Sequence, residues 1–279
     1  MWIENSAPCE CATERENLAP SRDRKGAVEA ICQLYPSLTV GARTSVFPPE
    51  VFLKILSIDT SSRAGSILLG EDQKVLGEIN LDSSETHSVR LLSGVDYLLK
   101  NLGIRLLDLD AFAVVSGPGS FTGIRIGLTT VKGLADSTSK PVIPITALEA
   151  WVEKFPRLQG TIVPLIDARR GEVYAAVFER IGDAVKELDA GKVAKPAQIL
   201  SQLVQEQIVF IGGGATQYRD LLINCCHPGW KVATCDPFLG RSMARIAYQR
   251  AMDGRFTSAQ DLQAYYLRRS DAEIYWKEQ

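Results

Sequence analysis

The same order of elements occurs twice in the chain, and this repetition limits the possible folds more than any other feature. Lys54–Thr60 and Thr161–Asp167 are short apolar runs of the kind that form buried strands. Each carries an aspartate at its end, and these two residues, Asp59 and Asp167, are 108 positions apart. Internal repetition on this scale predicts two similar α/β units that arose by duplication.

The elements that follow are expected in the same order in both units. Three antiparallel strands come first, because short apolar runs alternate with turn residues such as Gly70–Gln73. Helices and strands then alternate. In the first unit we expect helices over 84–102 and from the end of a glycine-rich turn to about 139, with strands over 111–115 and 141–145. In the second unit we expect strands over 171–178, 184–188 and 208–214, with helices over 196–206, 216–224, 239–252 and around 258–263.

Two such units describe an α/β fold of the doubled ribonuclease H-like kind, in which a nucleotide lies in the cleft between the halves. We place the two subdomains at 51–145 and 146–279. Residues 1–50 show no sustained periodicity, so we expect a disordered tail or a wrongly assigned upstream extension, with Val51 as the alternative start. The six cysteines match no common zinc pattern and are expected as free thiols in a reducing cytosol.

A glycine-rich stretch, Ser116–Gly127, follows the strand expected at 111–115 and reads SGPGSFTGIRIG. Its proline and glycines favour a tight turn, and its hydroxyl side chains are suited to cap the next helix. Free backbone N–H groups at such a helix start can hold an anion. The candidate nucleotide-binding residues are therefore those of the turn and the two strand-end aspartates: Asp59, Gly117, Gly119, Ser120, Thr122, Gly123 and Asp167. The alternative is a turn that needs glycine only for its backbone shape, with aspartates that accept hydrogen bonds from the turns they begin.

Several kinds of catalysis are disfavoured by the same residues. The stretch is not a P-loop, because Gly123 is followed by Ile-Arg and not by Lys-Ser or Lys-Thr. It is not a nucleophile elbow either, because Pro118 stands where the first glycine of that motif belongs. The only histidines, His87 and His227, are too far apart in sequence to form a metal-binding pair on one helix. We therefore expect no catalytic residue and no metal site in this chain.

Charge and hydropathy disfavour two classes of partner. The formal net charge of -2 argues against a protein that binds nucleic acid strongly by itself, which usually needs a basic face. No apolar run approaches the roughly 20 residues that span a membrane. We expect a globular, cytoplasmic protein.

Segments along 53–270 resemble the TsaB (YeaZ) family. They read ILSIDTS at 55–61, HSVRL at 87–91, SGPGSFTGIRIG at 116–127, KGLA at 132–135 and DARRGEVY at 167–174. Tyr266–Arg268 resembles the usual C-terminal end of the family. The third and fifth segments are the most characteristic, and they are independent of each other.

The resemblance implies an actin-like ATPase fold, shared with Hsp70 and sugar kinases. It implies a part in making N6-threonylcarbamoyladenosine at position 37 of tRNAs that read codons starting with A. The chain would be the non-catalytic dimerisation subunit, which binds the catalytic paralogue TsaD, works with the ATPase TsaE and reaches tRNA through the complex. A homodimer is implied when the partner is missing. ATP or ADP with magnesium is left open as a ligand of the complex, whereas Leu91 stands where the paralogue has its second metal-binding histidine.

The resemblance also implies that the helices after the third and fourth strands meet a partner as a four-helix interface. The candidate side chains form apolar stripes on these helices: Leu91, Leu92, Val95, Leu98, Leu99, Ile124, Leu128 and Val131. The alternative function is a weak ATP or GTP hydrolase, or a small-molecule kinase, that uses Asp59 and Asp167.

Overall fold

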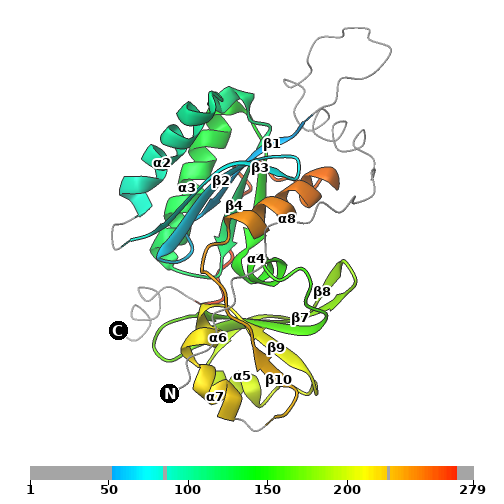
Figure 1. Ribbon diagram of the computed structural model, residues 1–279. Coiled ribbons are helices and arrows are strands. Elements are labelled where there is room, and N and C mark those ends of the chain that lie inside the picture. Colours follow the sequence, from blue (N-terminus) through cyan, green and yellow to red (C-terminus); the bar gives the residue numbers. More distant parts are fainter. Residues whose placement is uncertain (1–51, 84–86, 225–226, 269–279) are drawn as a thin grey trace, which may run out of the picture.

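The computed structural model describes residues 52–83, 87–224 and 227–268 (Figure 1). The expectation for residues 1–50 lies outside these ranges. The described part forms two five-stranded mixed sheets with helices packed on them. Within these residues, every helix is too short or too polar to span a membrane.

The two sheets share one strand topology. The first contains β1 (Lys54–Asp59), β2 (Ala64–Glu71), β3 (Lys74–Asp82), β4 (Ala111–Gly117) and β5 (Val142–Thr146), in the order β3-β2-β1-β4-β5. The second contains β6 (Gly160–Asp167), β7 (Val173–Ile181), β8 (Ala184–Ala194), β9 (Ile208–Ile211) and β10 (Trp230–Val232), in the equivalent order β8-β7-β6-β9-β10. In both, the first three strands pair antiparallel and the later strands pair parallel. The doubled α/β fold predicted from the sequence is confirmed.

The helices of the two halves differ much more than the strands do. In the first half, α2 (His87–Leu102) and α3 (Phe121–Thr138) are long and cover one face of the first sheet. Their counterparts in the second half are α5 (Pro196–Leu200), α6 (Gly213–Gln217) and α7 (Arg219–Asn224), none longer than 6 residues. A short 3₁₀ helix, η2 (Leu106–Asp108), precedes β4.

Two further helices join the halves. The first, α4 (Ala147–Glu153), packs on strands of both sheets, and the second, α8 (Gly240–Met252), packs on the first sheet although it follows the second in sequence (Figure 1). One hydrophobic core therefore contains side chains of both sheets and of both helices. Glu153 adds a polar link, because it accepts hydrogen bonds from Arg180 on β7 (3.1 Å) and Arg245 on α8 (2.9 Å).

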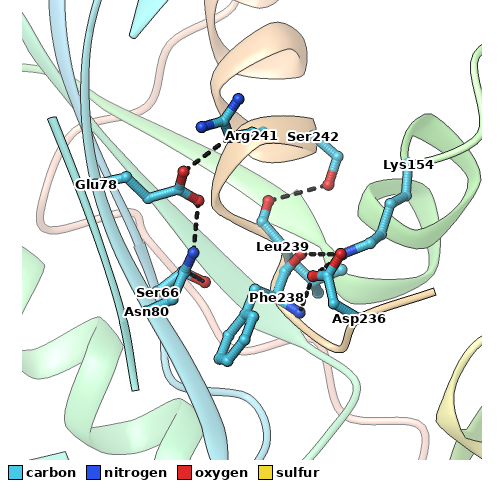
Figure 2. A network of polar contacts seen from close by, with 9 residues as sticks. All are labelled: Ser66, Glu78, Asn80, Lys154, Asp236, Phe238, Leu239, Arg241 and Ser242. Atoms are coloured by element: carbon cyan, nitrogen blue, oxygen red, sulfur yellow. Dashed lines mark hydrogen bonds and ion pairs between the residues drawn. The ribbon is translucent and has the colours of Figure 1, made fainter. Parts of the chain in front are cut away.

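Polar contacts fix the start of α8 on the first sheet (Figure 2). Arg241 of α8 donates to Glu78 of β3 at 2.8 Å, and Asn80 donates to the same carboxylate at 2.9 Å. The segment that leads into α8 is held from the other side by Lys154, which pairs with Asp236 at 2.6 Å. These contacts anchor the segment just before α8 and the first turn of the helix itself.

Two helices of the second half differ from the expectation. The helix expected over 196–206 ends at Leu200, its last buried side chain, and Val204 one turn later is 87% exposed. The helix expected over 216–224 is divided into α6 and α7 because Tyr218 leaves the helical conformation, with φ of -103° and ψ of 22°.

The remaining differences lie in short segments. Around 258–263 the chain makes a turn and not a helix, with the Ser258 hydroxyl accepting the Asp261 N–H at 3.0 Å. Helix α4 and strand β10 were not expected. For α4 the sequence carried a signal, since Thr146 and Glu149 form a reciprocal capping box.

Candidate functional site

The glycine-rich turn joins β4 to α3, and several of its polar groups form hydrogen bonds within the chain. The Ser120 side chain caps α3 by accepting the N–H of Gly123 at 3.3 Å. The Ser120 N–H donates to the Ser61 carbonyl at 2.6 Å, and the Ile124 N–H returns to the Ser120 carbonyl at 2.8 Å. Of the predicted candidates in this turn, Thr122 is the exposed one. Capping and the neighbouring loop therefore engage three N–H groups around the helix start, those of Ser120, Gly123 and Ile124.

Close packing explains the glycines. A Cβ at Gly123 would lie 2.0 Å from the carbonyl oxygen of Thr60, and one at Gly119 would lie 2.3 Å from that of Ser61. Gly117 has a φ of +134°, and a Cβ there would lie 2.2 Å from the carbonyl oxygen of Tyr265. Two segments of the chain itself, the turn after β1 and the C-terminal segment, thus occupy the space that the glycines leave.

This arrangement does not fit a phosphate in the glycine-rich turn. A phosphate cradle needs free backbone N–H groups and open space beside them. Here the N–H groups of Ser120, Gly123 and Ile124 are bonded within the chain. We therefore derive no nucleotide chemistry from this turn. Backbone shape and close packing explain its glycines best.

The two strand-end aspartates make the same local hydrogen bond. Asp59 Oδ1 accepts the N–H of Ser61 at 2.8 Å, and Asp167 Oδ1 accepts the N–H of Arg169 at 2.9 Å. Each aspartate thereby begins the turn that leaves its strand.

Asp59 is buried in a small cavity between the first sheet and α2. It is only 1% exposed, and its Oδ2 atom has no hydrogen-bond partner among the described residues. Burial raises the pKa of this carboxyl, opposed by the hydrogen bonds from Ser61 and the charge of His87. His87 and Arg90 from the first turn of α2 also line the cavity, and His87 Nε2 donates to the Ser62 carbonyl at 2.6 Å.

Asp167 is exposed, and the loop that follows it is held in an unusual conformation. Arg169 and Arg170 have φ of 61° and 53°, in the left-handed region that side chains other than glycine rarely adopt. Both arginine side chains are exposed. Within the described residues, no cluster of histidine, cysteine, aspartate or glutamate side chains is arranged to hold a metal ion.

The expected partner surface requires a correction. Seven of its eight side chains lie in the chain's own core, because both helices turn their apolar stripes toward the first sheet: Leu91, Val95, Leu98, Leu99, Ile124, Leu128 and Val131. Leu92 is the exception, with 56% of its surface exposed. Val89 and Tyr97 of α2 are also exposed, at 67% and 63%. The stripe identified the buried faces of the helices, and the surface available to a partner is this other side.

The C-terminal segment supplies contacts that the sequence did not predict. The Tyr266 ring stacks on Phe121 with centroids 4.8 Å apart, and Arg125 donates to the Tyr266 hydroxyl at 3.2 Å. Arg268 pairs with Glu172 at 2.7 Å. The segment thus contacts both the start of α3 and the loop after β6. In the sequence these three parts, the glycine-rich stretch, the loop after β6 and the C-terminal segment, were visible only as separate motifs. Contacts between residues so far apart leave no local periodicity that would predict them.

Known proteins of similar sequence and structure bear on these motifs. Residues 75–253 match the family model described as TsaD, tRNA N6-adenosine threonylcarbamoyltransferase. The tRNA threonylcarbamoyladenosine biosynthesis protein TsaB of Haemophilus influenzae is 32% identical over 236 residues, covering 81% of this chain and 96% of that protein. The protein of the same name from Escherichia coli is 30% identical over 232 residues, with 81% and 97% covered. A solved Pseudomonas aeruginosa structure, described as similar to peptidase YEAZ, is 25% identical with a TM-score of 0.65, covering 77% of this chain and all (100%) of that one.

Proposed function

The chain belongs to the TsaB family of tRNA threonylcarbamoyladenosine biosynthesis proteins, and from this membership we propose that it is the non-catalytic partner subunit of the transferase. Its task is to bind the catalytic paralogue TsaD and hold it in an active arrangement. TsaE and tRNA join through the complex, and the modified base is adenosine 37 of tRNAs that read codons starting with A. In the absence of TsaD, the same surface pairs two copies of the chain.

The observation that carries the partner role is the outward side of α2. Val89, Leu92 and Tyr97 are each more than half exposed on one helix, whereas the opposite side of that helix is buried in the core. Exposed apolar and aromatic side chains on the outward side of a helix are typical of a protein interface. The neighbouring helix α3 packs beside α2.

The non-catalytic role is supported by the engagement of the candidate groups. The N–H groups of Ser120, Gly123 and Ile124 are bonded within the chain, and Asp59 and Asp167 each hold a turn. At the start of α2, His87 donates to the Ser62 carbonyl, and Leu91, one turn later, is a core side chain.

Charge reversal on the exposed face tests the partner role. We expect Leu92→Glu to abolish co-elution with the TsaD of the same organism in size-exclusion chromatography. Because Leu92 is outside the core, the free energy of unfolding should change by no more than about 0.5 kcal/mol.

The matched control is Ile181→Glu, which places the same charge on a side chain that is 70% exposed on the β7–β8 hairpin. This variant should still co-elute with TsaD. Co-elution of Leu92→Glu at the wild-type level would contradict the proposed surface. Leu98→Glu cannot replace it, since Leu98 is a core residue and its ionised substitute would unfold the chain.

One observation favours the alternative of a weak nucleotide hydrolase or kinase: the buried, unpartnered Oδ2 atom of Asp59. Calorimetric titration of the isolated chain with Mg-ATP, followed by a turnover assay, separates the two functions. Turnover that disappears in Asp59→Ala would establish the enzyme. We expect no turnover by the isolated chain.

A further inference from the structure

We propose that a group of exposed arginine and tyrosine side chains, packed around the half-buried ring of Phe121, binds an unpaired loop of the tRNA. We call it the arginine–aromatic surface, and it consists of Phe121, Arg125, Arg169, Arg170 and Tyr266. The inference rests on the proposed function, which makes a tRNA the substrate of the complex. It adds a direct RNA contact on this subunit, at a place separate from the outward side of α2.

The aromatic part of the surface is formed where the C-terminal segment crosses the start of α3. Tyr266 stacks on Phe121 at an interplanar angle of 28°, and the Arg125 guanidinium carbon lies 3.8 Å from the centre of the Phe121 ring. Arg125 also donates to the Tyr266 hydroxyl, which fixes the two planar groups relative to each other. Tyr266 remains 42% exposed, so part of its ring surface is available to a stacked base.

The basic part is the loop after β6, whose ends are pinned while its tip carries two arginines. Ala168 and Glu172 are joined by a backbone hydrogen bond of 2.9 Å, and the Glu172 N–H donates to the Arg169 carbonyl at 3.0 Å. Between them, Arg169, Arg170 and Gly171 all have positive φ, from 53° to 77°. Non-glycine residues persist in this conformation only where surrounding contacts impose it, and such strain is concentrated at functional sites. Here two exposed arginine residues lie at the tip of a loop that backbone hydrogen bonds close.

Arg268 connects the two parts. It donates to the Ala168 carbonyl at 3.0 Å and pairs with Glu172 at 2.7 Å, so it neutralises one of the two acids of the loop. Tyr266 is only two residues before Arg268, a distance of about 7 Å along an extended chain. The aromatic and basic parts therefore lie next to each other, and three arginines are exposed there, as is Asp167.

This chemistry suits single-stranded RNA better than other ligands. Guanidinium groups bind phosphates with two parallel hydrogen bonds, and unpaired bases stack on aromatic rings and on arginine planes. A chain of net charge -2 has no general attraction for nucleic acid, so a local basic and aromatic surface is needed for contact. The unpaired bases of a tRNA loop supply both the phosphates and the free base faces.

The test compares variants of the full chain in complex with TsaD, using an unmodified tRNA transcript and a binding titration. For the double variant Arg169→Ala/Arg170→Ala we expect about tenfold weaker tRNA binding and a log–log salt dependence less steep by about 1 to 2, because phosphate contacts are lost. For Tyr266→Leu we expect about fivefold weaker binding with an unchanged salt dependence, because stacking is not ionic.

The matched control is Arg157→Ala, an exposed arginine at the opposite end of β6 from Arg169. It should bind tRNA like the wild type. Assembly with TsaD is measured separately for every variant. Loss of assembly in the arginine double variant would make the surface a protein interface and overturn the RNA proposal, as would unchanged tRNA binding.

Failure of the proposed function has a different signature, namely a wild-type chain that does not assemble with TsaD. In that case the same titration is made with the free chain at low salt. Weaker binding by the double variant than by Arg157→Ala would still support the arginine–aromatic surface, and equal binding would overturn it.

Discussion

The turn after β1 and the turn after β6 begin with the same hydrogen bond but lie in opposite surroundings. Asp59 accepts the N–H two residues later and is buried, whereas Asp167 makes the equivalent bond and is exposed. The first turn packs under the start of α3, with the Thr60 hydroxyl donating to the Gly123 carbonyl at 2.7 Å. The second turn carries exposed arginines. The two halves thus share the local geometry of these turns and not their environment.

The difference comes from where the following helix meets the first strand of each sheet. In the first half, glycines of the turn and of α3 approach the backbone of Thr60 and Ser61, just after the aspartate. In the second half, Gly212 and Gly214 approach the backbone of Leu165, two residues before the aspartate. The covering helix is displaced along the strand, so the aspartate turn of the second half stays exposed.

Substitution at the close approach has the largest expected effect on this comparison. Gly123→Ala should destabilise the chain by about 3 kcal/mol, because its Cβ would meet the Thr60 backbone and neither element can yield easily. Gly213→Ala is the control in the second half, since a Cβ there has open space around it. Its unfolding free energy should stay equal or rise by up to about 1 kcal/mol. If urea unfolding gave equal losses of unfolding free energy for Gly123→Ala and Gly213→Ala, the two turns would be covered alike.

A smaller effect should separate the two aspartates by pH. Burial raises the pKa of Asp59 above its ordinary value of 3.8, so the folded chain holds this proton more tightly than the unfolded chain does. Protonated Asp59 therefore contributes to the stability of the fold below pH 3.8, and this contribution is lost as the pH rises through the raised pKa. Asp59→Asn should therefore gain stability relative to the wild type between acidic and neutral pH.

Thermal unfolding measured across that pH range checks the expectation, with Asp167→Asn as the exposed control. Curves for Asp59→Asn and the wild type that remain parallel would contradict it. The asparagine retains the acceptor for the Ser61 N–H, so loss of the turn itself does not confuse the result.

The smallest effect concerns the backbone of the two turns. Arg169→Gly should stabilise the chain by about 0.5 to 1 kcal/mol, because glycine adopts the left-handed conformation without strain. At the equivalent position of the first half, Ser61→Gly should destabilise by about 1 kcal/mol, since glycine loses more chain entropy and the buried Ser61 side chain that hydrogen-bonds Asp59 is removed. Denaturant titration of the two variants gives the signs. Changes in the same direction would indicate that the strain at Arg169 is relieved in another way.

How far the sequence determines the molecule differs between fold and site. Short apolar runs such as Thr161–Asp167, separated by turn residues, predicted the strands and their doubling, because strand burial leaves a local pattern. The stripe on α2 predicted which side of the helix is apolar but not what covers it, and the chain's own sheet covers Leu98 and its neighbours. The junction of Arg125 with Tyr266 spans 141 positions and leaves no periodic signal. The sequence therefore predicted local structure, but it did not predict which distant segments contact each other.

The position of α8 has a consequence for how the chain is made. This helix covers the first sheet, yet it follows β5 by roughly 90 residues, which a ribosome adds in about 5 to 20 s. During that interval the face of the first sheet that α8 will cover is without its helix, and its apolar side chains are open to chaperones. A chain released before residue 240 would lack this cover permanently, so premature termination should yield an aggregating product and not a functional first half.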